Sequence, residues 1–335
     1  MAKKSSVIED KIYAELGINP SDYLNNIVMA KDYATYSISP RIDPTCGGGI
    51  KEGSLVLIEG PEKLGKTTLA LTIGASAQNH DKNKRKLIYI DTENRLQERD
   101  LKISGLSIDS DVFHPIGSTE LKVMSAEDVF NLIESLIAKF KNSVIILDSF
   151  SMLCSRQEIE YKYESQFRQD VQRMTATFCR KMSQVLRPSR NTIIGILHQH
   201  ANQNASGPYA PKKVTSGGTK VQYATNYRFV LTHKEDNKVD EVIVGHKVYF
   251  KCACHPSESV SSNASYFFHK FGIGIDKARE IVEIAKELGI IKAKGAWLTL
   301  PDGQQFQGIQ NLTEFVRNNK DASGMLLESI NEITT

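Results

Sequence analysis

The sequence has no hydrophobic run long enough to cross a membrane. A transmembrane helix needs about 18–20 consecutive apolar residues, and no segment of this chain approaches that length. The first six residues lead into the acidic pair Glu9 and Asp10 instead of an apolar signal core, so secretion is not expected. The sequence therefore predicts a cytoplasmic location and no membrane partner.

Paired cysteines are also missing. The five cysteines are an odd number, and no two of them form a CxxC pair, which is typical of a reducing compartment. Cys252, Cys254 and His255 lie close together in the chain. Two cysteines one residue apart, without a matching second pair, do not make a zinc site.

Neither sign of charge is in excess. There are 42 lysines and arginines against 39 aspartates and glutamates, which gives a net charge of +3. This balance neither supports nor excludes a nucleic-acid partner, so any DNA-binding surface must come from local clustering of charge.

Low-complexity tracts and internal repeats are absent too, and 40% hydrophobic residues argue for a folded globular chain.

Apolar strands alternating with helical segments dominate the middle of the chain. A continuous apolar strand followed by a helix, repeated several times, indicates a buried parallel sheet, so we predict an α/β fold with a central, mostly parallel sheet. The expected strands are 55–60, 87–93, 144–149 and 192–199, with helices at 66–78, 125–140 and 166–186. Later strands at 227–233, 241–252 and 264–270 are expected to be antiparallel.

The two ends of the chain differ from this core. Residues 7–16 have helical spacing, with Ser6 as a possible N-cap and Gly17 as a possible end. From Asp276 the pattern becomes helical again. We therefore expect an N-terminal helix and arm over 1–48, a core over 49–270, and a small C-terminal α/β lobe and tail over 271–335.

The most specific motif in the chain is a phosphate-binding loop. The pattern G-x-x-x-x-G-K-[ST] lies between an apolar strand and a helix, which is the context that it requires. Backbone N–H groups and the helix N-terminus would face the phosphates, the lysine would reach the β and γ phosphates, and the threonine hydroxyl would bind Mg²⁺. The predicted ATP-binding residues are Gly60, Pro61, Glu62, Lys63, Leu64, Gly65, Lys66, Thr67 and Thr68.

Three polar residues at strand ends complete this candidate site. Asp148 ends an apolar strand. A carboxylate at this position could bind Mg²⁺ together with Thr67. Glu93 ends the neighbouring strand, where a carboxylate can orient and deprotonate the attacking water. Gln199 ends a fourth strand and could contact the γ-phosphate. The polar loop 200–216 follows it at the edge of the sheet where α/β proteins place their sites, so Gln199 could report the nucleotide state to this loop.

These motifs together resemble the RecA family, including its phage-encoded recombinases, from about residue 49 to residue 318. GPEKLGKTTL resembles the family's GPESSGKTTL, and YIDTE resembles its FIDAE, whose glutamate is the catalytic base. VIILDS resembles VIVVDS, LHQ resembles INQ with its γ-phosphate sensor, and KAKGAWLTL is similar to KAGAWYSY of the C-terminal lobe. The resemblance implies a RecA-type P-loop ATPase core with a polymerisation arm, in which Glu93, Lys66 and Gln199 are the catalytic residues.

The resemblance also covers the elements that face DNA. Residues 158–182 resemble the family's first DNA-binding loop and the helix after it, and 200–216 take the place of the second. Within that helix we expect a buried stripe of Phe167, Val171, Met174, Phe178, Met182 and Val185. The DNA-binding candidates are Arg168, Arg173, Arg180, Lys212, Lys213, Gly217 and Gly218.

The chain departs from the family pattern at three places. Asp100 stands where a tyrosine usually stacks on adenine. Lys251 matches the first of two lysines that reach the neighbouring subunit's ATP, but Ala253 stands at the second. Gln222 and Tyr223 replace a lysine–phenylalanine pair at the subunit switch.

The implied function is ATP-dependent homologous recombination. Such a protein forms a helical filament of its own copies on single-stranded DNA, hydrolyses ATP with Mg²⁺, and exchanges strands with homologous double-stranded DNA. Single-strand-binding and mediator proteins are candidate accessory partners, and a phage-encoded chain would act in the host cytoplasm. The alternatives are a hexameric DNA helicase, which the GAW segment disfavours, and a non-catalytic recombination mediator, which intact Lys66, Glu93 and Asp148 disfavour.

Overall fold

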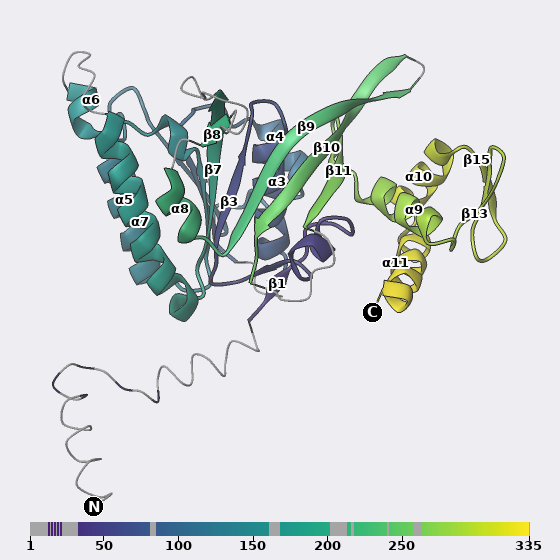
Figure 1. The fold of residues 1–335 in the computed structure, drawn as a ribbon, viewed down its shortest axis with the longest axis horizontal. Helices are drawn as coiled ribbons and strands as arrows, with labels where there is room; N and C mark the ends of the chain where they lie inside the picture. The colour runs from purple at the N-terminus through teal and green to yellow at the C-terminus, as the bar shows by residue number, and fades with distance from the viewer. Residues whose placement is uncertain are drawn as a thin grey trace, which may run out of the picture. The chain divides into compact units, whose positions relative to one another are not determined.

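A large mixed sheet with helices on both faces forms most of the molecule (Figure 1). The computed structural model describes residues 13, 15, 17, 19, 21, 33–80, 85–160, 168–201, 213–215, 218–239, 241–256 and 263–334. The chain divides into two compact units, Met1–Ala34 and Thr35–Thr335, and the second carries every element discussed below. The helix predicted over 7–16 lies almost entirely outside the described residues.

The central sheet follows the strand order β12-β11-β10-β9-β3-β7-β6-β4-β5, with β8 paired to β7. The five strands from β3 to β5 run parallel to their neighbours, and β9 pairs parallel to β3. The strands are β3 (Leu55–Gly60), β4 (Leu87–Asp91), β5 (Phe113–Gly117), β6 (Val144–Asp148), β7 (Thr192–Ala201), β8 (Lys213–Thr215), β9 (Tyr227–Val239), β10 (Val242–Cys254), β11 (Ala264–Lys270) and β12 (Gly274–Ile275). The predicted α/β fold with a mostly parallel sheet is confirmed.

Helices α5 (Ala126–Lys139) and α7 (Arg168–Ser189) cover one face of this sheet (Figure 1). Helix α3 (Lys66–Gln78) packs against β6, β3 and β7, and the short α4 (Glu98–Ser104) packs beside α3. Ser125 caps α5 by accepting a hydrogen bond from the backbone N–H of Asp128, which satisfies a donor left free at a helix start. The later strands β9, β10 and β11 pair antiparallel with one another, as predicted.

The predicted buried stripe of α7 is partly wrong. Val171, Phe178 and Met182 are buried, but Val185 is 39% exposed and Leu186 is 1% exposed. The repeat of four residues from Phe178 through Met182 continues to Leu186, because a spacing of four keeps successive side chains on nearly the same helix face. Phe167 lies outside the described residues.

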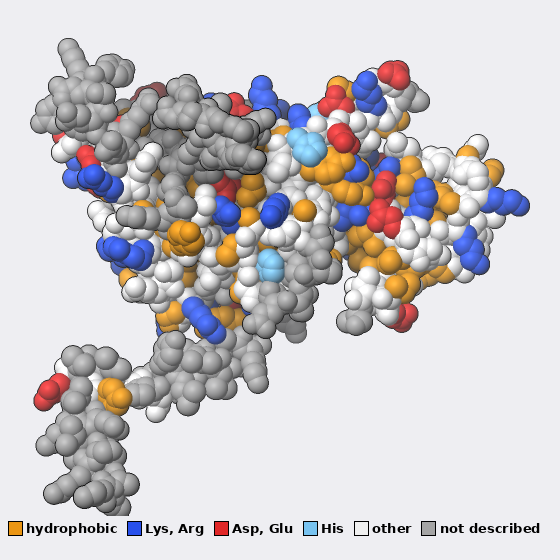
Figure 2. Space-filling view, in the orientation of Figure 1, with side chains coloured by type: hydrophobic (Ala, Val, Ile, Leu, Met, Phe, Trp, Pro, Cys, Tyr) orange, Lys and Arg blue, Asp and Glu red, His pale blue; other side chains and the backbone are white. Residues whose placement is uncertain are grey.

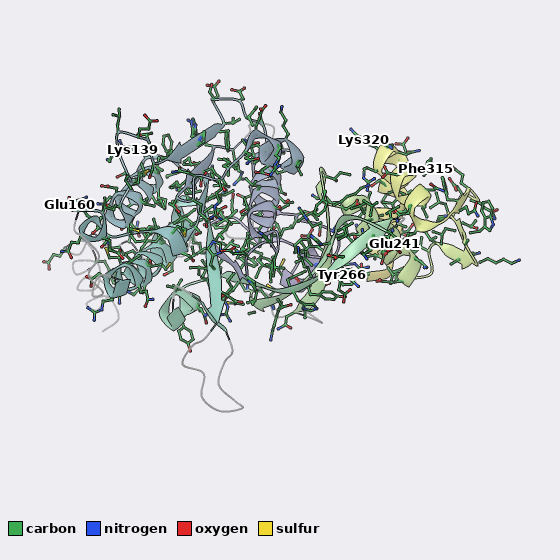
Figure 3. All side chains as sticks on the ribbon, turned by 90° about the horizontal axis from the view of Figure 1, so that it is seen from above. Lys139, Glu160, Glu241, Tyr266, Phe315 and Lys320 are labelled. Atoms are coloured by element: carbon green, nitrogen blue, oxygen red, sulfur yellow. The ribbon has the colours of Figure 1, made fainter. Side chains whose placement is uncertain are left out.

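A second hydrophobic cluster belongs to the C-terminal elements. Here α9 (Lys277–Glu287), α10 (Ile309–Asn318) and α11 (Lys320–Thr334) pack with a small antiparallel sheet of β13 (Lys292–Lys294), β14 (Trp297–Thr299) and β15 (Gln305–Gln307). Figure 3, the view from above, labels Phe315 and Lys320 on these helices and Tyr266 on the central sheet. The Tyr266 hydroxyl donates to Glu287 of α9 at 3.3 Å. The boundaries proposed at residues 48 and 270 remain predictions.

Candidate nucleotide and DNA site

The glycine-rich turn between β3 and α3 has a backbone that only glycine supports well. Gly60 has φ 157°, and a Cβ built there would lie 2.7 Å from the backbone oxygen of Leu231. Gly65, directly before α3, has φ 82° in the left-handed region, which costs other residues conformational energy. The turn therefore delivers Lys66 and Thr67 to the first turn of a helix whose N-terminal N–H groups are available to an anion.

Lys66 lies over this turn. Its Nζ donates to the carbonyl oxygen of Pro61 at 2.7 Å, and the residue is only 6% exposed. Burial lowers the pKa of the ammonium, while nearby Asp148, Glu93 and Glu62 raise it. A cation held in a poorly hydrated position interacts strongly with a phosphate.

Asp148, at the end of β6, accepts two hydrogen bonds on Oδ2. Thr67 Oγ1 donates at 2.7 Å and the Tyr89 hydroxyl donates at 2.8 Å. Burial raises the pKa of this carboxyl, and the two hydrogen bonds lower it. A carboxylate beside a threonine hydroxyl is an all-oxygen donor set of the kind that Mg²⁺ prefers. The structure thus brings together the two predicted metal ligands, which lie 81 positions apart in the chain.

Glu93 follows the end of β4 and is held from two neighbouring segments. Its Oε1 accepts from Ser149 Oγ at 2.8 Å and contacts His198 Nε2 at 2.6 Å, and Arg95 Nη1 lies 3.3 Å from Oε2. The hydrogen bond from His198 is the largest cause that lowers the pKa of Glu93, to about 2. The carboxylate is therefore ionised at neutral pH.

These residues line one cavity of about 680 Å³, a size typical of small-molecule sites. We call one set of its lining residues the inner wall: Lys66, Thr67, Tyr89, Glu93, Asp148 and His198. Its outer wall consists of Arg95, Arg99, Asp100, His269 and Phe271. Of the predicted ATP-binding residues, Glu62, Lys63, Gly65 and Thr68 also line the cavity.

The end of β7 contributes a residue that the sequence analysis passed over. Ile196 and His198 line the cavity, and Gln199 is not among the lining residues. Alternation along a strand explains this, because residues two apart share a face and Gln199 lies on the other one. The backbone of Gln199 pairs instead with Thr215 of β8. The histidine in LHQ, a titratable group directly at the end of an apolar strand, was the available signal.

Phe271 and the two glycines after it are further lining residues that were missed. Phe271 and Gly272 belong to the turn between β11 and β12, Gly274 begins β12, and Phe271 is 51% exposed. Asp100 lies on this side of the cavity at the start of α4, where its Oδ2 accepts from the backbone N–H of Gln97 at 3.2 Å. An aromatic residue directly after a strand, followed by two glycines, was the signal for this turn.

None of the described residues predicted to face DNA or a neighbouring subunit lines the cavity. Arg173 and Arg180 are exposed on α7, and Lys251 is exposed on β10 between Val230 and Ala264. Arg168 begins α7, Lys213 begins β8 and Gly218 begins α8 (Gly218–Tyr223). Lys212 and Gly217 lie outside the described residues. Figure 2 shows lysines and arginines in separate groups on the coloured part of one face, including one group over α5 and α7.

No helix among the described residues is long and apolar enough to span a membrane.

A model of the RecA N-terminal domain matches residues 28–266. The chain is 26% identical over 285 residues to Protein RecA of Saccharopolyspora erythraea, covering 85% of this chain and 79% of that protein. It is 25% identical over 295 residues to Protein RecA of Bacillus licheniformis, covering 88% and 81%. The mitochondrial DNA repair protein recA homolog 3 of Arabidopsis thaliana is 26% identical over 342 residues, covering 99% and 76%.

Proposed function

The chain belongs to the RecA family, and from this premise we propose that it is an ATP-dependent recombination protein that assembles on single-stranded DNA and exchanges strands with homologous duplex. The observation that carries the proposal is the inner wall of the cavity. One cation, one hydroxyl–carboxylate pair and one ionised glutamate converge there from α3 and from the ends of β4 and β6. This is the set of groups that ATP hydrolysis needs.

The chemistry assigns each group a role. The N–H groups of the turn from Gly60 to Gly65 and the Lys66 ammonium bind the phosphates. Thr67 and Asp148 would hold Mg²⁺, which neutralises charge on the transferred phosphoryl group. Glu93 orients a water molecule and accepts its proton as the water attacks phosphorus and the bond to ADP breaks.

DNA is bound by the exposed basic residues and by the loops that follow β6 and β7. Arg173 and Arg180 lie seven residues apart on α7, so they project from nearly the same side of the helix. Such arginines neutralise backbone phosphates without reading base identity, and base pairing between strands supplies the homology search. Gln199 connects the two sites, because it lies on β7 directly after the cavity residue His198 and on the strand that leads into the second loop.

The filament arises from repeated contact between different surfaces of neighbouring copies, since a heterologous contact that does not close gives a helix of subunits. Lys251 is exposed on β10, where it is free to approach the nucleotide of an adjacent copy. The N-terminal arm over 1–48 is the proposed polymerisation element, and the lobe over 271–335 is the proposed C-terminal domain.

One pair of assays tests the proposal. ATP turnover is measured with and without single-stranded DNA, and strand exchange is measured between a circular single strand and homologous linear duplex. We expect turnover to rise with DNA and joint molecules to form only with ATP and Mg²⁺. Unwinding of tailed duplexes by rings would instead identify a helicase, and DNA-independent binding of ATP without turnover would identify a mediator.

A further inference from the structure

We propose that His198 is the positioning residue of Glu93, so that the general base is held by the strand that leads to the DNA-binding loop. This inference rests on the proposed function, because it concerns how the same hydrolytic site is organised. It assigns a role to a residue that the motifs leave without one.

The contact itself is short and sheltered. His198 Nε2 lies 2.6 Å from Glu93 Oε1, and the two side chains are 14% and 10% exposed. An ionised carboxylate has only acceptor sites, so Nε2 carries the hydrogen and donates it. A charge-assisted bond of this length is among the stronger hydrogen bonds in proteins.

The other two contacts of Glu93 constrain the orientation of its carboxylate less. Arg95 is 72% exposed and lies 3.3 Å away, a surface ion pair of the kind that contributes little. Ser149 Oγ donates to the same Oε1 at 2.8 Å, but a hydroxyl rotates freely about one bond. The imidazole is planar, and its orientation is set by a strand, so His198 fixes the direction in which the carboxylate points.

His198 is itself held in place by the fold. Its backbone N–H donates to Ser151 Oγ at 2.8 Å, and it pairs in register with Gly60, the first residue of the phosphate-binding turn. Three positions earlier, Gly195 lies so close to Phe150 that an added Cβ would be 2.1 Å from its ring. This end of β7 is therefore fixed against both β3 and the segment after β6.

The next residue along β7 links this contact to the DNA side. Gln199 pairs with Thr215 of β8, and His200 and Ala201 pair with Val214 and Lys213. A shift of β7 on DNA binding would move His198 and the glutamate bonded to it. The strand thus gives DNA binding a physical connection to the general base.

Gln and Met at position 198 provide a matched test, because the two side chains have nearly the same length and shape. The amide nitrogen of Gln reaches about as far as Nε2 of histidine, whereas Met has no donor. We expect His198→Met to lower kcat of DNA-stimulated ATP hydrolysis by about ten- to a hundredfold, with the ATP KM within about threefold of wild type. His198→Gln should keep kcat within about threefold. His114→Met, on β5 and outside the cavity lining, is the control and should match wild type.

The outcomes separate the two proposals. Absence of turnover in wild type overturns the proposed function itself, whereas unchanged turnover in Glu93→Gln removes Glu93 as the base and with it the role of His198. If those controls behave as expected, wild-type kcat in His198→Met overturns the role of His198. Equal losses in His198→Gln and His198→Met also overturn it, because the donor would then not matter. If His198→Met does not fold, His198→Glu replaces it, and a kcat equal to that of His198→Gln overturns the inference.

Discussion

The inner and outer walls of the cavity differ in how deeply their side chains are buried and how closely they are hydrogen-bonded. On the inner wall, Lys66, Tyr89 and Asp148 are all less than 10% exposed, and each has a hydrogen-bond partner within 2.8 Å. On the outer wall, Arg95 and Arg99 have side chains 72% and 74% exposed. Under the proposed function, the groups that perform chemistry must be held in one geometry, whereas the outer wall only has to contact the rest of the ligand.

The two walls of the cavity also come from different elements of the fold. The inner wall is assembled from α3 and the ends of three parallel strands, which meet at one edge of the sheet. The outer wall comes from α4 and the segment before it, and from the end of β11 and the turn that follows. Substitutions on the inner wall should therefore be costly and specific, and those on the outer wall should mainly change ligand preference.

The largest effect is expected at the proposed general base. Glu93→Gln keeps the shape and the contact with His198 but removes the proton acceptor, so hydrolysis should fall by about 10²–10⁴-fold. ATP binding should remain, because the phosphate-binding turn is untouched, and assemblies on DNA should persist. Single-turnover hydrolysis and nucleotide binding are measured on the same preparation. Wild-type turnover in this variant would remove Glu93 from the mechanism.

The next effect concerns the connection between ATP and DNA. Gln199→Ala should bind ATP nearly normally but lose most of the ATP-dependent gain in DNA affinity, about 5–150-fold for a coupling of this kind. By linkage, DNA should tighten ATP binding in wild type and much less in the variant. DNA affinity is measured with an unhydrolysable ATP analogue and with ADP at one salt concentration. A variant that keeps the full difference would move the switch elsewhere, for example to Gln222 and Tyr223.

A smaller effect is expected from the buried hydroxyl of Tyr89. Tyr89→Phe removes the donor to Asp148 and should lower the free energy of unfolding by about 1–2 kcal/mol, since the acceptor is a charged group. Tyr249→Phe is the matched control, because its hydroxyl bonds Glu235 at the surface, and it should change stability by less than about 0.5 kcal/mol. Denaturant unfolding measures both. Equal effects at the two sites would contradict the contrast between buried and exposed contacts.

The pH dependence of unfolding provides a second test of the contacts of Glu93. Its pKa in the folded protein is lowered to about 2 from an ordinary 4.5, so these contacts stabilise the fold above pH 4.5. The contribution is lost as pH falls from 4.5 toward 2, because the unfolded chain takes up the proton first. The difference in unfolding free energy between wild type and Glu93→Gln should therefore shrink over this range. A difference that does not vary with pH would mean that Glu93 is not held as an ion.

The smallest effect is expected on the outer wall. Asp100 cannot stack on adenine as a tyrosine would, so ATP should be poorly distinguished from other purine triphosphates. Asp100→Tyr should increase the preference for ATP by about two- to tenfold, the range of one aromatic contact. Competition binding of ATP against GTP checks both statements. Strong ATP preference in wild type would show that another residue supplies the base contact.

The sequence alone determined the local elements and the motif residues. The strand at Leu55–Gly60 and the helix at Lys66–Gln78 were predicted with the bounds that the structure has, because a continuous apolar run, a glycine-rich turn and a helix start are all local signals. Thr67, Glu93 and Asp148 were found for the same reason, since each follows directly from the end of a strand or the start of a helix.

Only the tertiary structure decided which of these residues touch one another. His198 and Glu93 are 105 positions apart and Tyr89 and Asp148 are 59 apart, and no periodicity along the chain records such a pairing. Strand order and register place them together, and strand alternation turns His198, not Gln199, toward the cavity. The same holds for Leu186, whose burial depends on where α7 meets the sheet. Contacts between distant segments depend on the packing of whole layers, whereas a strand end or a helix start depends on its own few residues.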